Sequence, residues 1–229
     1  MRLSSIGSIN IFGLKVRTSY AEWAGLQTIS PPPLIVDVGV AYGTPVLHNM
    51  FPDAELILVE PLPIFHDYIE KKILSRRNGR LVKCAAGAEK GSAEIIMEKA
   101  DPLRSSFLER SALTKMQQEK SVITVDVDTL DNILADVAIR PGSLLKIDTE
   151  GFEMETLKGA KETLRKFDYV ITEASVMERF ENSYRMPELI SYMQGEGYML
   201  ETMLAAPIDK RGLIRVADLL FKAVIPAAR

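Results

Sequence analysis

The amino-acid sequence predicts a single-domain α/β fold, with a mostly parallel twisted sheet, helices on both of its faces and an antiparallel strand near the C-terminus. Short, continuously apolar runs recur along the chain, as is typical of strands that helices cover on both sides. Segments with helical spacing separate these runs, and parallel neighbouring strands need such crossovers. The length of 229 residues suffices for one large core but is short for two domains.

Five apolar runs are interpreted as strands of this sheet: 34–38, 56–59, 81–85, 144–147 and 169–172. The helices expected around them are 45–51, 64–74, 153–167 and 186–196. Towards the C-terminus, 198–202 and 216–222 are expected to pair as a hairpin across a loop that holds Pro207 and Gly212. Together these elements form one predicted domain, residues 34–225.

Two further segments stand apart from this pattern. Three consecutive prolines at 31–33 separate an extension, residues 1–33, in which we expect a hairpin over 8–16 through Gly13 and a helix over 18–29 that buries Trp23. An insertion is expected at about 91–128. Its segments 92–98 and 122–127 alternate like half-exposed strands, and the polar stretch 101–120 between them is predicted to contact the substrate.

Composition and charge exclude several classes of protein. With 47% hydrophobic and 26% charged residues, the chain is typical of a globular protein with a packed core. A net charge of -3 offers no positive field for a nucleic acid, which we exclude as a partner. No apolar run reaches the roughly 20 residues of a membrane helix, so we expect no membrane association and a cytoplasmic protein. The single Cys84 lies in an apolar run and is expected to be buried. Homo-oligomerisation is left open.

A glycine turn follows the first expected strand, where 35–43 reads Ile-Val-Asp-Val-Gly-Val-Ala-Tyr-Gly. Ligands of parallel sheets bind at the carboxyl ends of the strands, and Gly39 and Gly43 would let the backbone turn closely around one. A dinucleotide site is typified by G-x-G-x-x-G, whose second glycine is replaced here by Ala41. S-adenosylmethionine has no pyrophosphate, so the looser turn favours it over NAD(P), although an NAD(P)-dependent oxidoreductase and a purely structural turn remain alternatives.

Acidic residues close the next strands. Glu60, followed by Pro61, ends the run 56–59, where a carboxylate can accept hydrogen bonds from both hydroxyls of a ribose. Asp148 and Glu150 follow the run 144–147 and would lie at the same edge of the sheet. We predict that Asp148 is a general base or orients the substrate. Glu150 is a second catalytic candidate, for which a structural role is equally open.

Two more acids and two histidines bear on metal binding. Glu153 would lie in the first turn of a helix, where the helix dipole favours negative charge. Glu173 ends the run 169–172, and carboxylates at three strand ends could hold a divalent cation. His48 and His66 are expected to be structural or surface residues. We therefore assign no metal ligand and leave a divalent metal open.

Taken in order, these motifs resemble the FkbM-type methyltransferase family over about residues 34–222. The matching segments are Val36-Asp37-Val38-Gly39 with Gly43, Val59-Glu60-Pro61, Ser105-Ser106, Thr129-Leu130-Asp131, and Lys146-Ile147-Asp148-Thr149-Glu150-Gly151-Phe152-Glu153 with Leu157-Lys158-Gly159-Ala160. The resemblance implies a Rossmann-like class I methyltransferase that uses S-adenosylmethionine. It also implies O-methylation of a sugar, a polysaccharide or a secondary metabolite, so the expected partner is a small-molecule or carbohydrate acceptor.

Site residues carried over by position complete the prediction. The resemblance implies that the methionine end of the cofactor borders Asp37, Gly39 and Gly43, that Glu60 with Pro61 holds the ribose, that Ser106 contacts the cofactor and that Asp148 faces the reaction centre. The family usually has Ala-Asn after the first glycine, where Val40-Ala41 stand here. Loss of that Asn removes a polar contact near the cofactor, which leaves a catalytically inactive adenosyl-binding protein as a second alternative.

Overall fold

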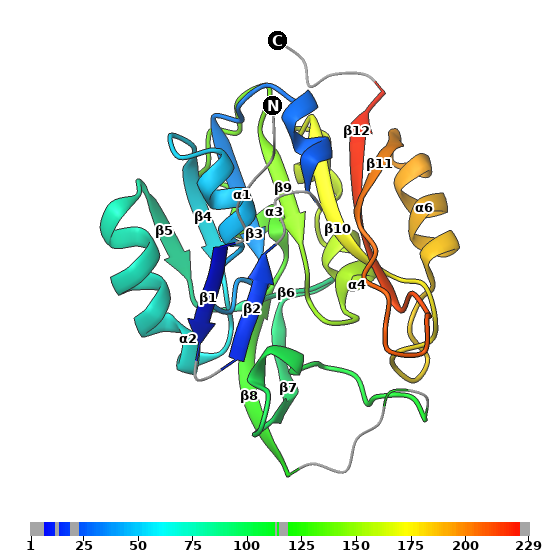
Figure 1. The fold of residues 1–229 in the computed structure, drawn as a ribbon. Helices are drawn as coiled ribbons and strands as arrows, with labels where there is room; N and C mark the ends of the chain where they lie inside the picture. The colour runs from blue at the N-terminus through cyan, green and yellow to red at the C-terminus, as the bar shows by residue number, and fades with distance from the viewer. Residues whose placement is uncertain (1–6, 12–13, 19–22, 113, 115–118, 225–229) are drawn as a thin grey trace.

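A seven-stranded sheet forms the centre of the computed structural model, which describes residues 7–11, 14–18, 23–112, 114 and 119–224 (Figure 1). Its strand order is β11-β12-β10-β9-β3-β4-β5. The strands are β3 (Leu34–Val38), β4 (Glu55–Val59), β5 (Gly79–Val82), β9 (Leu144–Ile147), β10 (Tyr169–Ser175), β11 (Tyr198–Ala205) and β12 (Val216–Ala223). Strands β5, β4, β3, β9 and β10 are parallel, and β12 is antiparallel to β10 and β11. This arrangement confirms the predicted fold class and the C-terminal hairpin.

The strand order places a ligand site beside β3. From β3 the chain first builds β4 and β5 on one side, and it later adds β9 and β10 on the other. Such a reversal is a topological switch point, where the loops that leave neighbouring strands diverge and open a crevice at their carboxyl ends.

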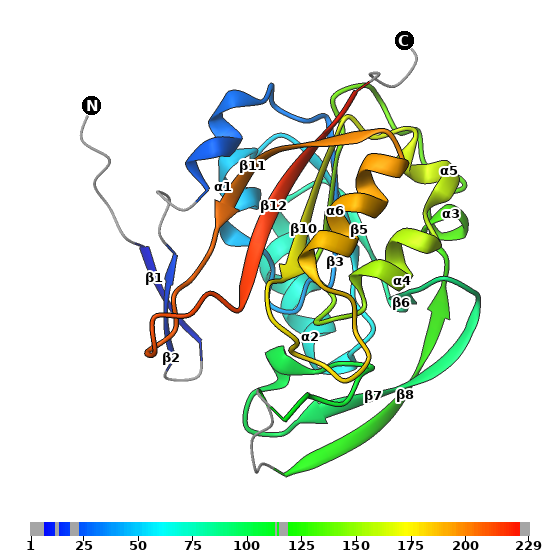
Figure 2. The same cartoon turned by 90° about the vertical axis from the view of Figure 1, so that its right-hand side faces the viewer.

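Helices cover both faces of the sheet and bury two apolar clusters (Figure 2). On one face lie α1 (Pro45–Met50), α2 (Pro63–Tyr68) and the 3-10 helix η1 (Ala24–Thr28). On the other lie α3 (Leu130–Ile133), α4 (Glu153–Lys158), α5 (Lys161–Leu164) and α6 (Met186–Gly195). Every residue of β3 is buried, with Ile35 in the first cluster and Leu34 and Val36 in the second. The continuous apolar run thus follows from burial on both sides.

The predicted insertion forms a small sheet of its own. The two expected strands are present as β7 (Gly91–Glu98) and β8 (Lys120–Asp128), which pair antiparallel, and the short β6 (Ala85–Ala86) pairs with β8. Together with the 3-10 helix η4 (Pro102–Arg104), they lie beyond the carboxyl ends of the parallel strands (Figures 1 and 2). The insertion is therefore placed where a ligand of the sheet would bind.

The N-terminal hairpin is present, as β1 (Gly7–Ile11) paired with β2 (Leu14–Thr18), while Gly13 lies outside the described residues. Of the helix expected over 18–29, residues 19–22 lie outside the described residues; Thr18 belongs to β2, and the described remainder forms the 3-10 helix η1 and not an α-helix. Trp23 is buried as predicted. The division into 1–33 and 34–225 stays a prediction. Within the described part of the chain, no helix has the length and apolar character needed to span a membrane.

Two other elements differ from expectation. The expected strand 81–85 is two strands, because the chain leaves the main sheet after Val82 and joins β8 at Ala85. Cys84 lies at this crossing and is half-buried rather than buried, with its thiol pKa raised to about 11 by desolvation. The expected helix 153–167 is α4 and α5, separated at Gly159, where a Cβ would lie 2.0 Å from the Gly87 carbonyl oxygen.

Candidate active site

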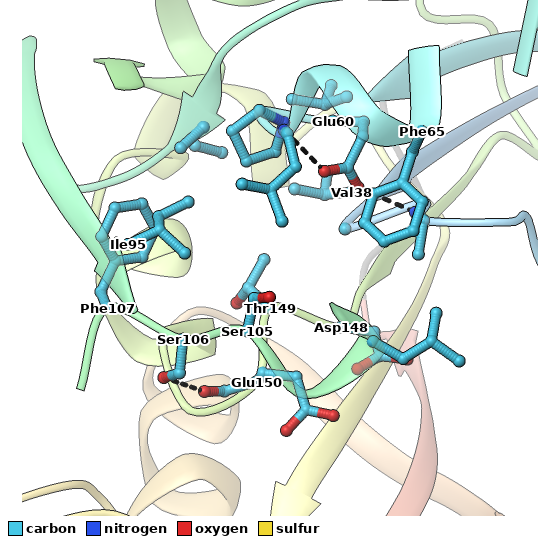
Figure 3. A pocket seen from close by; sticks show the side chains of 18 of the residues that line it. Val38, Glu60, Phe65, Ile95, Ser105, Ser106, Phe107, Asp148, Thr149 and Glu150 are labelled. Carbon is cyan, nitrogen blue, oxygen red and sulfur yellow. Dashed lines mark hydrogen bonds between the residues drawn. The ribbon is translucent and has the colours of Figure 1, made fainter. Parts of the chain in front are cut away.

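A cavity lies at the carboxyl ends of β3, β4 and β9, between the main sheet and the insertion (Figure 3). Most of the predicted site residues meet there: Gly39, Glu60, Pro61, Ser106, Asp148 and Glu150 all line it. Apolar side chains form much of the remaining wall, namely Val38, Leu62, Phe65, Ile95, Leu103 and Phe107. Two predicted residues, Asp37 and Gly43, are not on the wall.

The glycine turn is joined to the end of β9 by backbone packing. Gly39 has φ 79, and a Cβ on it would lie 1.8 Å from the Asp148 carbonyl oxygen. The parallel pairing continues into this region, since the Asp148 N–H donates to the Val38 carbonyl at 3.0 Å. Gly39 is thus required by a left-handed conformation and by a close approach, and it brings the turn against the strand end that carries Asp148.

Glu60 is a buried carboxylate on the opposite wall. One oxygen accepts the Ala41 N–H and the other accepts the Leu62 N–H, each at 2.8 Å. Desolvation raises the pKa of Glu60 to about 7, and the two backbone donors only partly offset it. Each oxygen retains a further lone pair for an external donor.

Ala41 adopts a left-handed backbone, with φ 46, in order to present its N–H to Glu60. Among residues other than glycine, Asn and Asp tolerate this region best. The Asn that the family usually has here would therefore suit the backbone conformation, quite apart from any polar contact to a cofactor. The resemblance in sequence by itself predicts only the polar contact.

Asp37 lies beneath the cavity within an ion-pair network. Its Oδ1 is 3.2 Å from Lys146 Nζ, and its Oδ2 accepts from Thr44 and contacts His48 Nε2, each at 2.9 Å. Burial opposes the ionisation of Asp37, but Lys146 and the hydrogen bonds outweigh it and lower the pKa to about 2. Lys146 also reaches Asp148 Oδ2 at 3.4 Å. The Lys146 ammonium therefore contacts both the buried Asp37 and the cavity-lining Asp148.

Four acids lie at the ends of β9 and β10, namely Asp148, Glu150, Glu153 and Glu173. Glu153 is 1% exposed, and its oxygens accept the N–H groups of Thr149 and Gly151 at 2.9 to 3.1 Å and the Tyr184 hydroxyl at 2.6 Å. Although it lies in the first helical turn as predicted, it also holds the loop 149–151. Burial raises the pKa of Glu153.

Arg179 joins the other two acids of this edge. Its guanidinium pairs with Glu173 and lies 2.5 Å from Glu150 Oε2. Burial raises the pKa of Glu150 to about 7 and that of Glu173 well above its usual value, and Arg179 offsets part of each shift. Carboxylate oxygens of Asp148, Glu153 and Glu173 lie within 4.8 Å of one another, so two strand-end acids come together with Glu153, which was expected only as a helix-end charge. Arg179 and the donors to Glu153 already pair with two of them, and we assign no metal.

Reasoning from the sequence missed the cationic and phenolic partners of these acids, namely Lys146, Arg110, Arg179 and Tyr184. Lys146 carried a signal, because a lysine within a buried apolar strand requires a charged partner. The others lie in irregular segments without periodicity, so no local pattern marks them.

Comparison with known proteins agrees with this geometry. The family model of the methyltransferase FkbM domain matches residues 37–200, most of the chain. The chain belongs to the FkbM methyltransferase family. Methyltransferase sdnD of Sordaria araneosa is 24% identical to this FkbM protein in an alignment 194 residues long, which covers 72% of this chain and 73% of that protein.

Solved structures show the same fold at low identity. The fibrillarin of Aeropyrum pernix with bound S-adenosyl-L-methionine has a TM-score of 0.51 and 13% identity, with 96% of this chain and 84% of that chain covered. An rRNA methylase of Streptococcus thermophilus has a TM-score of 0.50 and 9% identity, with 90% and 94% covered. Family and fold together make the protein an S-adenosylmethionine-dependent methyltransferase, and they do not favour the oxidoreductase or the inactive alternative.

The cavity of this FkbM protein has groups that fit the cofactor. Glu60 offers two acceptor oxygens to a ribose, and apolar walls at Leu62, Phe65 and Phe107 suit a flat base. Thr149 Oγ1 is a buried atom of the lining residue Thr149 without a hydrogen-bond partner in the described structure. The acids of the opposite edge would favour a sulfonium charge, because opposite charges attract strongly where water is excluded.

Proposed function

We propose that this FkbM methyltransferase methylates a hydroxyl group of a sugar, a polysaccharide or a secondary metabolite, with Asp148 as the general base. The observation that carries the proposal is the state of the Asp148 carboxylate. Its side chain lines the cavity and is 35% exposed, and Lys146 holds Oδ2 while no partner is found for Oδ1 among the described residues. One oxygen is thus anchored and the other is free to accept a proton.

The reaction asks for alignment and for one proton acceptor. S-adenosylmethionine supplies a methyl group that is already activated by its sulfonium. The acceptor hydroxyl would give its proton to Asp148 as its oxygen attacks the methyl carbon and the bond to sulfur breaks. A positioned base contributes about 10²- to 10⁴-fold to such a step, and alignment of the reactants contributes further. Glu150 is the weaker catalytic candidate, because Arg110 and Arg179 already pair with its carboxylate.

Charge supports a small or carbohydrate acceptor rather than a nucleic acid. The net charge is -3, and the four acids at the ends of β9 and β10 outnumber the three cations that pair with them, Lys146, Arg110 and Arg179. The phosphate groups of a nucleic-acid backbone would be repelled from this edge. Hydroxylated acceptors carry no such charge and can donate hydrogen bonds to carboxylates.

The test measures release of S-adenosylhomocysteine across a panel of hydroxylated acceptors. With a turned-over acceptor, Asp148→Asn should lower kcat by about 10²- to 10⁴-fold while S-adenosylmethionine still binds. Asp126→Asn, at an exposed position on β8, is the matched control and should leave kcat unchanged. Full turnover by Asp148→Asn would remove Asp148 as the base. Cofactor binding without turnover of any acceptor would instead favour the inactive alternative.

A further inference from the structure

The insertion contributes one wall of the cavity. Residues 102–107, which we call the roof, provide Pro102, Leu103, Ser105, Ser106 and Phe107 to the lining, opposite Glu60 and Phe65 (Figure 3). The cavity is partly open to solvent and its volume is only about 70 Å³. Sites for small molecules are typically about 300 to 1,000 Å³. An adenosyl cofactor therefore needs the cavity to widen, and the roof is the wall that belongs to the insertion and not to the main sheet.

Backbone pairing fixes the roof to the rest of the site. Directly after the roof, segment 109–111 runs antiparallel to segment 179–181 of the loop between β10 and α6. The Ser111 N–H donates to the Arg179 carbonyl at 2.9 Å, and the Glu181 N–H donates to the Glu109 carbonyl at 2.8 Å. We call these two paired segments the latch. The Ser111 hydroxyl also donates to the Glu178 carbonyl at 2.7 Å, and the Thr114 hydroxyl donates to the Arg179 carbonyl. All these bonds lie outside the seven-stranded sheet, so the latch can open without unfolding that sheet.

Charged side chains strengthen the latch around Glu150. Arg110 is 5% exposed, its Nε lies 3.0 Å from Glu98 Oε1, and its Nη2 lies 3.4 Å from Glu150 Oε2. Arg179, from the other segment, contacts the same Oε2 at 2.5 Å. One guanidinium from the insertion and one from the loop after β10 therefore bind the same Glu150 carboxylate. Hydrogen bonds to charged groups are stronger than those between neutral groups.

Phe180 lies between the two guanidiniums and the loop that carries Glu150. The Arg110 and Arg179 guanidinium carbons lie 4.8 and 5.2 Å from the Phe180 ring centroid, within the range of cation–π contacts. The ring also packs on Gly151, where a Cβ would lie 2.5 Å from it. The roof itself contacts this loop, because the Ser106 hydroxyl donates to the Glu150 carbonyl at 2.6 Å. Movement of the roof thus requires these contacts to separate.

We propose that Arg110 and Arg179 are positioning residues that hold the roof over the cofactor cavity through Glu150, and that opening of the latch controls entry and release of the cofactor. The proposal rests on the assignment of the cavity to S-adenosylmethionine. It gives the buried arginines a role that is separate from the methyl-transfer step, since neither lines the cavity. It also gives Glu150 a role other than catalysis.

The proposal has a kinetic signature. If the latch is closed in both the free and the bound protein, weakening it raises the open population of both. Association and dissociation rate constants of S-adenosylhomocysteine should then rise together, by about tenfold for a loss worth one charged hydrogen bond, while Kd changes little. Loss of an ordinary binding contact would instead raise the dissociation rate alone.

The experiment uses stopped-flow binding of S-adenosylhomocysteine to the full chain. Arg110→Met should raise both rate constants. Arg110→Lys keeps the charge but loses the planar guanidinium that can bind two acceptors, so its rate constants should lie between those of Arg110→Met and wild type. Lys99→Met is the matched control, because Lys99 forms an exposed ion pair with Glu119 in the same insertion. Unchanged rates in Arg110→Met, or a rise in dissociation alone, would overturn the proposal.

Amide hydrogen exchange of the cofactor-free protein separates this proposal from the assignment of the cavity. The amides of Ser111 and Glu181, which bond across the latch, should exchange faster in Arg110→Met and Arg110→Lys than in wild type or Lys99→Met. If the wild-type cavity failed to bind S-adenosylhomocysteine, the cavity assignment would fall, and the proposal with it, whatever the exchange rates. If binding were normal and the two amides exchanged at the wild-type rate in both variants, only the latch would be wrong.

Discussion

On the β3–β4 side of the cavity, Glu60 is held by the backbone amides of Ala41 and Leu62, which lie 19 and 2 residues away in the chain. On the β9–β10 side, Glu150 is held by the side chains of Arg110 and Arg179, which lie 40 and 29 residues away. Glu60 thus depends on backbone donors of two turns, and Glu150 on charged side chains from two separate segments. Substitutions on the second side should disturb several segments at once, whereas those on the first should act locally.

The residue shared by both sides should give the largest effect on stability. Lys146→Met leaves the buried Asp37 carboxylate without its cation, and loss of one partner from a buried pair costs about 3 to 5 kcal/mol. Urea unfolding measures the change in free energy. The double variant Lys146→Met with Asp37→Asn should recover part of the loss, because the unpaired charge is gone.

Lys158→Met is the control for this prediction, since Lys158 forms an exposed pair with Glu155 and should cost less than about 1 kcal/mol. Equal losses for Lys146→Met and Lys158→Met would mean that the buried network contributes no more than a surface pair. Lys146 would then not be the residue that stabilises both sides of the cavity.

The β9–β10 side can be broken at Glu153. Glu153→Ala leaves the N–H groups of Thr149 and Gly151 without their acceptor and removes one of the two acceptors of the Tyr184 hydroxyl, at a cost of roughly 2 to 4 kcal/mol. Glu155→Ala, two residues on in the same helix but partly exposed, should cost less than about 1 kcal/mol. Thermal or urea unfolding distinguishes them. A loss for Glu153→Ala no larger than that for Glu155→Ala would show that water replaces the missing carboxylate.

The β3–β4 side should respond to pH through Glu60. Its pKa, raised from 4.5 to about 7 by burial, means that the folded protein holds a proton that the unfolded chain has lost, so Glu60 lowers stability as pH rises from 4.5 towards 7. Ribose hydroxyls at this position would donate to the carboxylate and favour its ionised form. Binding should therefore release a proton, and affinity for S-adenosylmethionine should rise about tenfold from pH 6 to pH 8.

Calorimetry in buffers of different ionisation enthalpy measures this proton release and the affinity together. Glu60→Gln should bind more weakly at pH 8 and lose most of the pH dependence, whereas Glu89→Gln, at an exposed position, should behave as wild type. Unaltered pH dependence in Glu60→Gln would assign the titration to another group. It would also remove the main support for the ribose contact.

The smallest effect is expected at Ala41, where the change should stabilise. Ala41→Asn suits the left-handed backbone at φ 46 and should add about 0.5 to 1 kcal/mol to the free energy of unfolding. The N–H bond to Glu60 would be kept, because the backbone is unchanged. Urea unfolding tests this prediction. A destabilised Ala41→Asn would mean that its side chain meets steric conflict in the turn.

Much of the β3–β4 side of the cavity could be predicted because its signals are local. A glycine after an apolar strand and an acid after the next one fix Gly39 and Glu60 to one edge of a parallel sheet. The same reasoning placed Asp148 correctly at the edge. It failed for the helix over 153–167, which is interrupted at Gly159, where the Gly87 carbonyl of a distant segment approaches too closely for a Cβ.

The sequence by itself determined the apolar runs of strand length, the crossovers between them and the acids at their ends, since these depend on periodicity and chain length alone. Only the tertiary structure decided which charges neutralise the acids. Arg110 reaches Glu150 from the insertion and Arg179 from the loop after β10. The physical reason is that buried ion pairs depend on distance in space and on desolvation, and neither is encoded by spacing along the chain.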